Sequence, residues 1–513
     1  MNDTPQLRPV MLAGTGSDVG KSILATALCR IFVQDGYHPA PFKAQNMALN
    51  SYVTPDGLEL GRAQAVQAEA ACVPCHTDMN PVLLKPQSDH TSQVVLFGRP
   101  IGSMSARAYF RSEGRERLRT AACEAFDRLA ARYSPVVMEG AGSISELNLR
   151  DTDIVNLPMA RYARAAVILV ADIDRGGVFA SAYGSIALQT PEDRALIRGI
   201  IVNKFRGDIG LFSEGRRLLE QLCGVPVLGV VPYIEGLHID AEDSVALDAM
   251  PSEPASERVS VGVVRLPHIS NYTDFDALTQ QHGLHVFYTT DAATLLRADI
   301  ILVPGSKATV ADLAWLYATG IAAAVQQAAA AGTPVAGICG GYQMMGRQVL
   351  DPEGLEGSGT QQQGLGLLPV VTTITRSKRT RQVRFALCDS DAPGGDGSCM
   401  GYEIHQGRTV AVDGATAPPF ATLDDGTPDG CRLSPRLWGT YIHGVFDNPQ
   451  VVSMLLTALH SDKISSFAGT GLPAVPYATV RQRQYDRLAQ HVRRHVDIDR
   501  IYDILRTPYS LDA

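Results

Sequence analysis

Residues 13–22 read AGTGSDVGKS and follow the apolar run RPVMLAG at residues 8–14. The stretch is close to the phosphate-loop pattern G-x-x-x-x-G-K-[ST], except that Gly14 stands one position early. In such a loop, backbone N–H groups and a helix N-terminus converge on the anion, while the lysine follows the outer phosphates and the hydroxyl ligates magnesium. A chance glycine turn explains the glycines but not Lys21 and Ser22 together. We therefore predict a nucleotide site made of the following residues: Gly14, Thr15, Gly16, Gly20, Lys21 and Ser22.

The surrounding pattern is strand, loop, helix. Residues 21–36, KSILATALCRIFVQDG, have helical spacing and end at the stop signal Gly36. Further apolar, strand-like runs are separated by helix-like segments, which indicates a mostly parallel sheet covered by helices on both faces. These runs are SPVVMEG (134–140), AAVILVAD (165–172), GIIVNKF (199–205) and VPVLGVVP (225–232).

A second alternating series follows an acidic, proline-containing stretch that reads as a linker. Its strand-like runs are VSVGVVRLP (259–267), HVFYTT (285–290), DIILVPG (299–305), TPVAGICGG (333–341) and LWGTYIHG (437–444). We predict an α/β protein with two doubly wound, mostly parallel sheets and a helical C-terminal tail. The predicted parts are residues 1–240, a linker at 241–258, a second domain at 259–460 and a C-terminal segment at 461–513.

Composition narrows the function classes. A chain of 513 residues is expected to form two or three domains. Its net charge of -8, from 45 basic and 53 acidic residues without a long run of either sign, argues against nucleic acid or an anionic membrane as partner. The N-terminus lacks a basic flank before a long apolar stretch, and no apolar run reaches membrane-spanning length, so we expect a cytosolic protein.

Cysteine usage agrees with that location. The 9 cysteines are an odd number scattered from Cys29 to Cys431, unlike a disulfide framework. The stretch CVPCH at residues 72–76 matches a haem-attachment pattern, but without an export signal we interpret Cys72 and Cys75 as ordinary thiols near a helix end.

Three polar residues at strand ends complete the first predicted site. Glu139 ends a buried strand, and a carboxylate there points toward the crevice that holds the phosphates. Since Mg²⁺ prefers oxygen ligands beside phosphate oxygens, Ser22 and Glu139 are its expected ligands. Lys43, at the end of PAPFKAQN, is placed to reach the γ-phosphate, and Asn203, which ends GIIVNKF, is placed to read the nucleotide base.

A second candidate site lies in PVAGICGGYQMMG, residues 334–346, where Cys339 separates an apolar strand from two glycines that open a helix. A nucleophile on such a turn is lifted out of the sheet, and the helix N-terminus lowers its thiol pKa and helps to hold an oxyanion. The alternative is a buried, inert cysteine. His443, after the run LWGTYIHG, is the candidate base.

The phosphate loop resembles the variant loop of dethiobiotin synthetase and its relatives, as does EGAG at residues 139–142. In those enzymes the nucleotide activates a substrate carboxylate. The same spacing also occurs in partition and nitrogenase-type ATPases, so the loop alone leaves both classes open.

The segment around Cys339 resembles the class I glutamine amidotransferase domain, whose pattern is G-[IV]-C-x-G-x-Q. The resemblance implies that Cys339 attacks the glutamine amide and forms a thioester, that His443 shuttles protons, and that the N–H groups of Gly305 and Gly340 form the oxyanion hole. One departure is visible, because many such domains carry H-x-E whereas Gly444 and Val445 follow the histidine here. Alternative partners are Glu403 and His405 in GYEIHQG.

The whole chain resembles the cobyric acid synthase family. The resemblance is carried by FKAQNMALNSYVTPDGLELGRAQAVQA (42–68), MNPVLLKPQSDHTSQVVLFG (79–98), EGAGSISELNLRDTDIVNLPMA (139–160) and VADIDRGGVFAS (170–181). It implies ATP- and glutamine-dependent amidation of the b, d, e and g carboxylates of adenosylcobyrinic acid a,c-diamide, with ATP and Mg²⁺ as cofactors.

The same resemblance suggests three further roles. Asp56 or Glu59 joins Ser22 and Glu139 around magnesium, while residues 79–85 and 148–153 face the corrinoid or the acyl phosphate.

Two rival functions remain at this point. The sister enzyme cobyrinic acid a,c-diamide synthase shares both domains, but QNMALNS and NLRDTDIVN favour cobyric acid synthase. A regulatory or partition ATPase would need no glutaminase, and the turn at Cys339 argues against it.

Overall fold

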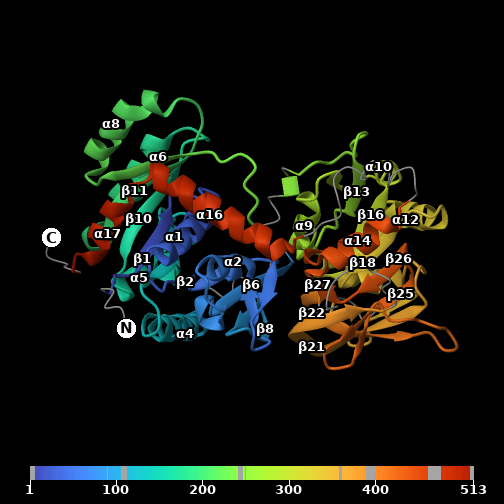
Figure 1. The fold of residues 1–513 in the computed structure, drawn as a ribbon. Coiled ribbons are helices and arrows are strands. Elements are labelled where there is room, and N and C mark those ends of the chain that lie inside the picture. The colour runs from blue at the N-terminus through green and yellow to red at the C-terminus, as the bar shows by residue number, and fades with distance from the viewer. Residues whose placement is uncertain are drawn as a thin grey trace. The chain divides into compact units, whose positions relative to one another are not determined.

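A computed structural model describes residues 6–88, 91–105, 112–240, 247–248, 250–356, 361–388, 399–459 and 475–508 (Figure 1). They divide into two compact units. The first comprises Met1–Ala48, Glu59–Asp240 and Arg481–Ala513, and the second comprises Leu49–Leu58 and Ala241–Val480. The short segment Leu49–Leu58 therefore belongs to the second unit, although the sequence pattern placed it in the first domain.

The first unit is built on a six-stranded parallel sheet with the order β12-β11-β10-β1-β9-β2. All of its residues in β1, β9 and β10 are buried, as expected for a sheet covered on both faces. The strand bounds are β1 Val10–Gly14, β2 Ala40–Phe42, β9 Val136–Glu139, β10 Ala166–Asp172, β11 Ile197–Phe205 and β12 Val227–Pro232.

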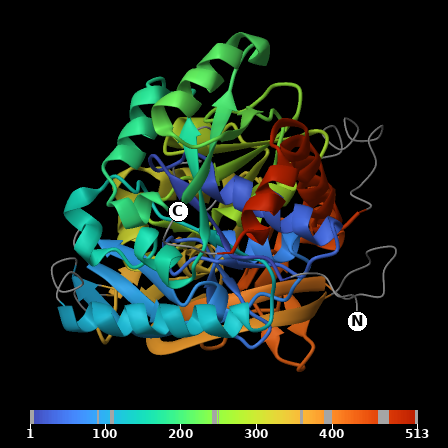
Figure 2. The same cartoon turned by 90° about the vertical axis from the view of Figure 1, so that its left-hand side faces the viewer.

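Helices link these strands. Helix α1 begins at Lys21, directly after the phosphate loop, and ends at Gln34, two residues before the left-handed Gly36. Figure 2 shows α4, in cyan, as the long helix along the bottom of this unit. Other helices in the described part of this unit include α2 Arg62–Ala70, α4 Ser112–Ala130, α5 Leu157–Tyr162, α6 Val178–Ala187, α7 Pro191–Arg194 and α8 Ser213–Cys223.

The first unit also contains a small four-stranded sheet, order β3-β6-β7-β8, that the strand pattern did not predict. Its strand β3 pairs parallel with β6, and β6, β7 and β8 are antiparallel. The bounds are β3 Gln45–Met47, β6 Val82–Ser88, β7 Thr91–Leu96 and β8 Arg99–Ser105.

The C-terminal helices α16, Tyr477–His495, and α17, Ile498–Arg506, have strongly amphipathic sequences. From Arg481 onward they belong to the first unit, and α16, in red, lies beside α1, in blue (Figures 1 and 2). Arg30 of α1 pairs with Asp486 at 2.7 Å, and Gly229 of β12 forms an isolated bridge with Val496.

The second unit has its own six-stranded sheet, order β15-β13-β16-β18-β26-β25, in which only β25 runs antiparallel. The strands are β13 Val259–Val264, β15 Leu284–Thr289, β16 Ile300–Val303, β18 Val335–Ile338, β25 Cys431–Ser434 and β26 Leu437–Thr440. Helices in this unit include α11 Thr309–Ala318, α12 Ile321–Ala330, α13 Gly340–Met345 and α14 Pro449–Thr457.

A second, largely antiparallel sheet in this unit was not predicted, because the middle of its longest strand is polar and partly exposed and gives no continuous apolar run. Strands β21, Val370–Leu387, and β22, Cys399–Ala411, form a long hairpin, and β22 pairs with the two-residue β27, Ile442–His443. Segment Leu49–Leu58 packs here, with Val53 in one apolar cluster with Tyr402.

The alternating strand-and-helix series expected from the sequence is present in both units. Within the predicted linker, the described residue Leu247 is buried and Pro251 accepts a hydrogen bond from Tyr288, so part of this stretch packs on the second unit. Among the described helices, none is both long and apolar enough to span a membrane. All 9 cysteines are free thiols.

The contact of β12 with the tail gives a test of what the C-terminal helices contribute to stability. A Cβ at Gly229 would lie 2.3 Å from the carbonyl oxygen of His495. We expect Gly229→Ala to lower the free energy of unfolding by about 1–3 kcal/mol, the usual cost of overpacking, measured by chemical denaturation. Gly184→Ala is the matched control, because its added methyl meets nothing within 4 Å. Equal stability of Gly229→Ala and the wild type would show that the tail does not contribute.

Candidate active sites

The phosphate loop of the first unit is anchored by its own lysine. Lys21 Nζ donates hydrogen bonds to the carbonyl oxygens of Gly16 and Gly142, each at 2.8 Å. A Cβ at Gly14 would lie 2.7 Å from Lys21 Nζ and 2.8 Å from the Gly16 oxygen, so a larger residue would displace the lysine. These contacts explain sterically why this loop has glycine at position 14.

Gly20, which caps α1, has a φ of 98°. A Cβ there would lie 2.1 Å from Nδ2 of Asn203, which donates to the carbonyl oxygen of Val19 at 2.8 Å. The structure thus brings Asn203 against the loop, where it fixes the backbone just before Lys21. Thr15 is tied to the neighbouring strand, since its N–H donates to the Val170 carbonyl at 3.0 Å.

The Glu139 carboxylate contacts two residues that the sequence predicted for this site and one that it did not. Ser22 Oγ donates to its Oε1 at 2.8 Å, Lys43 Nζ pairs with the same oxygen at 2.9 Å, and Gln67 Nε2 donates to Oε2 at 2.6 Å. Burial alone would raise the pKa of Glu139, but the Lys43 charge and these hydrogen bonds hold it below its usual value. The carboxylate is therefore ionised at neutral pH.

Gln67 is the residue that the sequence analysis missed at this site. It lies within AQAVQAEAA on α2, and an uncharged residue inside an alanine-rich helix gives no signal of function. Its complete burial is the only cue, because a buried amide needs a partner.

Ser22 and Glu139 present oxygen donors at the phosphate loop, as a Mg²⁺ ion shared with nucleotide phosphates requires. Asp56 is exposed and belongs to the second unit, so its role as a magnesium ligand stays a prediction. Glu59 is buried in an ion pair with Lys85. Within the described residues, no cluster of three or more His, Cys, Asp or Glu side chains could hold a metal by itself.

The second unit carries Cys339 on a sharp strand-to-helix turn between β18 and α13. Its φ of 52° and ψ of -108° are strained for a non-glycine residue, as found where a fold holds a functional side chain in place. A Cβ at Gly341 would lie 1.9 Å from the Val303 oxygen, so glycine is required behind the turn. The sulfur lies 3.8 Å from the carbonyl oxygen of Ile404.

His443 has a carboxylate partner that the sequence did not indicate. Its Nδ1 donates to Oδ2 of Asp274 at 2.7 Å, and the Gly444 N–H donates to the other oxygen at 2.9 Å. Asp274 lies 169 residues upstream, in a 3-10 turn, Tyr272–Phe275, where no motif marks it. Asp274 is therefore placed to orient the His443 imidazole, as the glutamate of the H-x-E pattern does in many such domains.

Burial lowers the pKa of His443, but Asp274 and Cys339 outweigh it and raise that pKa to about 10. The imidazole therefore carries two protons at neutral pH, with Nδ1 held by the carboxylate and Nε2 left to serve Cys339. A cation of this kind stabilises a thiolate and supplies the proton that a leaving amine needs.

Two backbone segments close around the histidine and the cysteine. A Cβ at Gly305 would lie 3.5 Å from Cε1 of His443, and one at Gly340 would lie 2.7 Å from the N–H of Ser306. The structure therefore brings Gly305, Gly340 and His443 together, as an oxyanion hole at this site requires.

The alternative pair is occupied differently. Glu403 forms an ion pair with Arg381, while His405 stacks on Tyr441 with ring centroids 3.7 Å apart. Burial lowers the pKa of His405, so it is neutral at physiological pH. Asp274 and His443 fit the catalytic roles better, because the carboxylate bonds the imidazole directly.

Comparisons with known proteins agree with these two sites. Residues 10–245 match the CobQ/CobB/MinD/ParA nucleotide binding domain, and residues 260–451 match the CobB/CobQ-like glutamine amidotransferase domain. The chain is 57% identical over 499 residues to cobyric acid synthase of Phocaeicola vulgatus, covering 97% of this chain and 98% of that protein.

The chain belongs to the cobyric acid synthase family. It is also 58% identical over 499 residues to cobyric acid synthase of Bacteroides fragilis and 47% identical over 509 residues to that of Klebsiella pneumoniae, in both cases over 97% of this chain and 98% of the relative. Membership of this family makes the protein an enzyme of the glutamine amidotransferase ligase class. The prediction of this family is confirmed, and the interpretation as a regulatory ATPase is not supported.

A substitution at Asp274 tests the orienting role. We expect Asp274→Asn to lower kcat/KM of glutamine hydrolysis by roughly 100-fold or more, because an amide cannot stabilise the imidazolium. In the wild type, activity should fall at alkaline pH as His443 loses its proton near pH 10, and in the variant this fall should move to lower pH. Glutamate release across pH measures both effects.

Asp276→Asn is the control for that experiment, since Asp276 lies in the next turn and does not bond His443. Unchanged rate and pH profile in Asp274→Asn would remove the aspartate from the mechanism.

The ion pair of Lys43 with Glu139 gives a prediction for stability. Since the pKa of Glu139 is lowered in the folded protein, its contribution to stability is present above its unfolded pKa and is lost as pH falls through the folded pKa. We expect Lys43→Met to cost about 3–5 kcal/mol at pH 7, because it leaves a buried, unpaired charge.

Denaturation of Lys43→Met across pH tests this expectation, and the penalty should shrink in acid as Glu139 takes up a proton. The double variant Lys43→Met/Glu139→Gln should recover part of the loss. A penalty that is the same at all pH values would show that Lys43 acts only by packing.

Proposed function

We propose that this enzyme amidates the b, d, e and g carboxylates of adenosylcobyrinic acid a,c-diamide with ATP and glutamine. The observation that carries the proposal is the 57% identity to a cobyric acid synthase across almost the full length of both proteins. The two sites support it, since one is equipped to hold nucleotide phosphates and the other to hydrolyse an amide. The sister reaction on the a and c carboxylates is the alternative.

The glutaminase half of the reaction follows from the second unit. The Cys339 thiolate attacks the glutamine side-chain carbonyl, the oxyanion is held by the N–H groups of Gly305 and Gly340, and His443 gives its proton to the departing ammonia. Water then hydrolyses the thioester, with His443 as base, and releases glutamate.

The ligase half follows from the first unit. A substrate carboxylate oxygen attacks the γ-phosphorus of ATP, the bond from this phosphorus to the β–γ bridging oxygen breaks, and ADP leaves. Lys21 and Lys43 are the cations placed to stabilise the charge of the transferring group. Ammonia then attacks the acyl carbon, and inorganic phosphate departs as the amide forms.

We propose that Ser22 and Glu139 hold Mg²⁺ beside the nucleotide. Bound there, the ion supplies charge neutralisation on the phosphate oxygens. Asn203 is proposed to lie at the base-binding end. We also propose a cytosolic location, where ATP and glutamine are available.

Product mass tests the proposal directly. With glutamine, Mg-ATP and adenosylcobyrinic acid a,c-diamide, we expect successive losses of about one mass unit as each hydroxyl becomes an amino group. Cys339→Ala should lose this activity with glutamine and keep it with ammonia, because only the nitrogen supply is removed. Cys388→Ala is the matched control, since Cys388 is half-buried and belongs to neither candidate site.

Two outcomes would contradict parts of the proposal. ATP turnover and amidation of the fully carboxylated corrinoid, but not of the a,c-diamide, would favour the sister reaction. Full activity of Cys339→Ala with glutamine would exclude the cysteine as nucleophile.

A further inference from the structure

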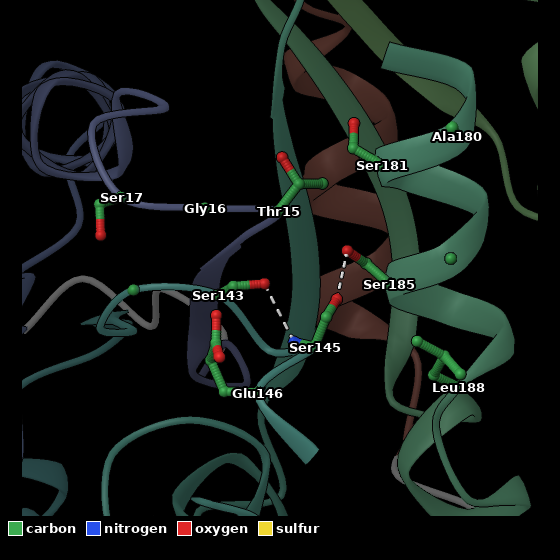
Figure 3. A pocket seen from close by; sticks show the side chains of 12 residues that line it. Thr15, Gly16, Ser17, Ser143, Ser145, Glu146, Ala180, Ser181, Ser185 and Leu188 are labelled. Carbon is green, nitrogen blue, oxygen red and sulfur yellow. Dashed lines mark hydrogen bonds between the residues drawn. The ribbon is translucent and has the colours of Figure 1, made fainter. Parts of the chain in front are cut away.

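A cavity of about 590 Å³ opens beside the phosphate loop in the first unit. Three segments form its walls: Thr15–Ser17 of the loop, residues 142–146 after β9, and one face of α6. Figure 3 shows Ser145 and Ser185 facing each other from two of these walls, with their hydroxyl oxygens 2.8 Å apart. The lining residues from α6 are Ala180, Ser181, Gly184 and Ser185, and Leu188 directly follows the helix.

The phosphate-loop lysine lies where two walls meet. Lys21 Nζ bonds the carbonyl oxygens of Gly16 and Gly142, and both glycines line the cavity. Lys21 itself is not among the lining residues, but its ammonium group is buried, so its charge is poorly screened and favours an anion near Gly16 and Gly142. Glu146 is the one acidic residue of the lining, and it is exposed to solvent, which screens its charge.

The lining is chemically mixed. Hydroxyl groups of Ser17 and Ser143 can donate hydrogen bonds to a carboxylate, whereas Ala180 and Gly184 offer room for methylene groups. This combination suits a short aliphatic arm that ends in a carboxylate. It does not suit a nucleoside base, because no aromatic side chain and no amide lines the walls.

Apolar surface adjoins the cavity. Arg150 donates to the Leu188 carbonyl oxygen at 2.8 Å and so joins the 3-10 helix η2, Leu147–Thr152, to the end of α6. Three leucines on these joined elements are exposed although apolar: Leu147, Leu149 and Leu188. A ligand with an apolar body and acidic arms would cover them.

We propose that this cavity receives one carboxylate-bearing side arm of the corrinoid while the macrocycle stays outside against the three leucines. The proposal rests on the function proposed above and assigns its acceptor site. The arm reaches the end of the cavity at Lys21, where its carboxylate meets the γ-phosphate.

Gly184 offers a sharp test, because a side chain added there enters the cavity. A Cβ at Gly184 meets nothing within 4 Å, and its backbone is ordinary helix, so a side chain can start from this position without backbone strain. We expect Gly184→Leu to raise KM for adenosylcobyrinic acid a,c-diamide by about tenfold or more. KM for ATP and the rate of glutamine hydrolysis should stay within about twofold of the wild type.

Ala187→Leu is the matched control, since Ala187 lies on the same helix but outside the lining. Gly184→Ala gives a milder second variant if Gly184→Leu folds poorly, and it should raise KM for the corrinoid less while leaving the protein at least as stable.

Each outcome is decisive. An unchanged corrinoid KM in Gly184→Leu, with normal wild-type amidation, would overturn the cavity assignment and leave the proposed function intact. A raised KM for ATP alone would assign the cavity to the nucleotide. No amidation by the wild type would overturn the proposed function, and the cavity assignment with it.

Discussion

One buried carboxylate organises the first unit. Glu139 ends the strand β9 and accepts from Ser22 of the phosphate loop, from Lys43 after β2 and from Gln67 of α2. An ionised carboxyl group is costly to bury without partners. Moving any of its three donors away would therefore cost free energy, and this holds the donors in place. Glu139 thereby holds three elements together: α1, the chain after β2, and α2. They meet where the phosphates of a nucleotide would lie.

In the second unit, too, a buried carboxylate is paired with a charged partner, and here the partner is the catalytic candidate. Asp274 keeps a buried imidazole charged, and this imidazole is the proposed acid and base for Cys339, which a strained turn holds in place. Since Asp274 comes from the turn before α9, Asp276–Thr279, rather than from the residue pair after His443, the geometry of a catalytic triad is preserved without its usual sequence spacing. Both sites therefore depend on a carboxylate that is buried, paired and remote in sequence from the group it serves.

Sequence reasoning reached the residues whose local pattern follows from their chemistry. The phosphate loop, Glu139 at a strand end and Cys339 on a glycine-rich turn are each defined by immediate neighbours, and the strands of both parallel sheets are continuous apolar runs. Asp274 and Gln67 escaped because their roles arise from contacts across the fold. The antiparallel sheets escaped because half-exposed strands such as β21 have a charged, polar central stretch instead of a continuous apolar run. Asp56, placed at the magnesium ion by resemblance, is exposed and belongs to the second unit, so that role stays a prediction.

In the reaction we propose, ATP activates a corrinoid carboxylate as an acyl phosphate in the first unit. The most direct measurement uses substrate whose reacting carboxylates carry ¹⁸O in both oxygens and follows the label in the products by mass spectrometry. Because the oxygen that attacks the γ-phosphorus leaves with it, the account predicts that each amide formed transfers one labelled oxygen to inorganic phosphate and keeps the other. Amide formation with unlabelled phosphate would show that ATP hydrolysis and amidation proceed without that intermediate and would contradict the account.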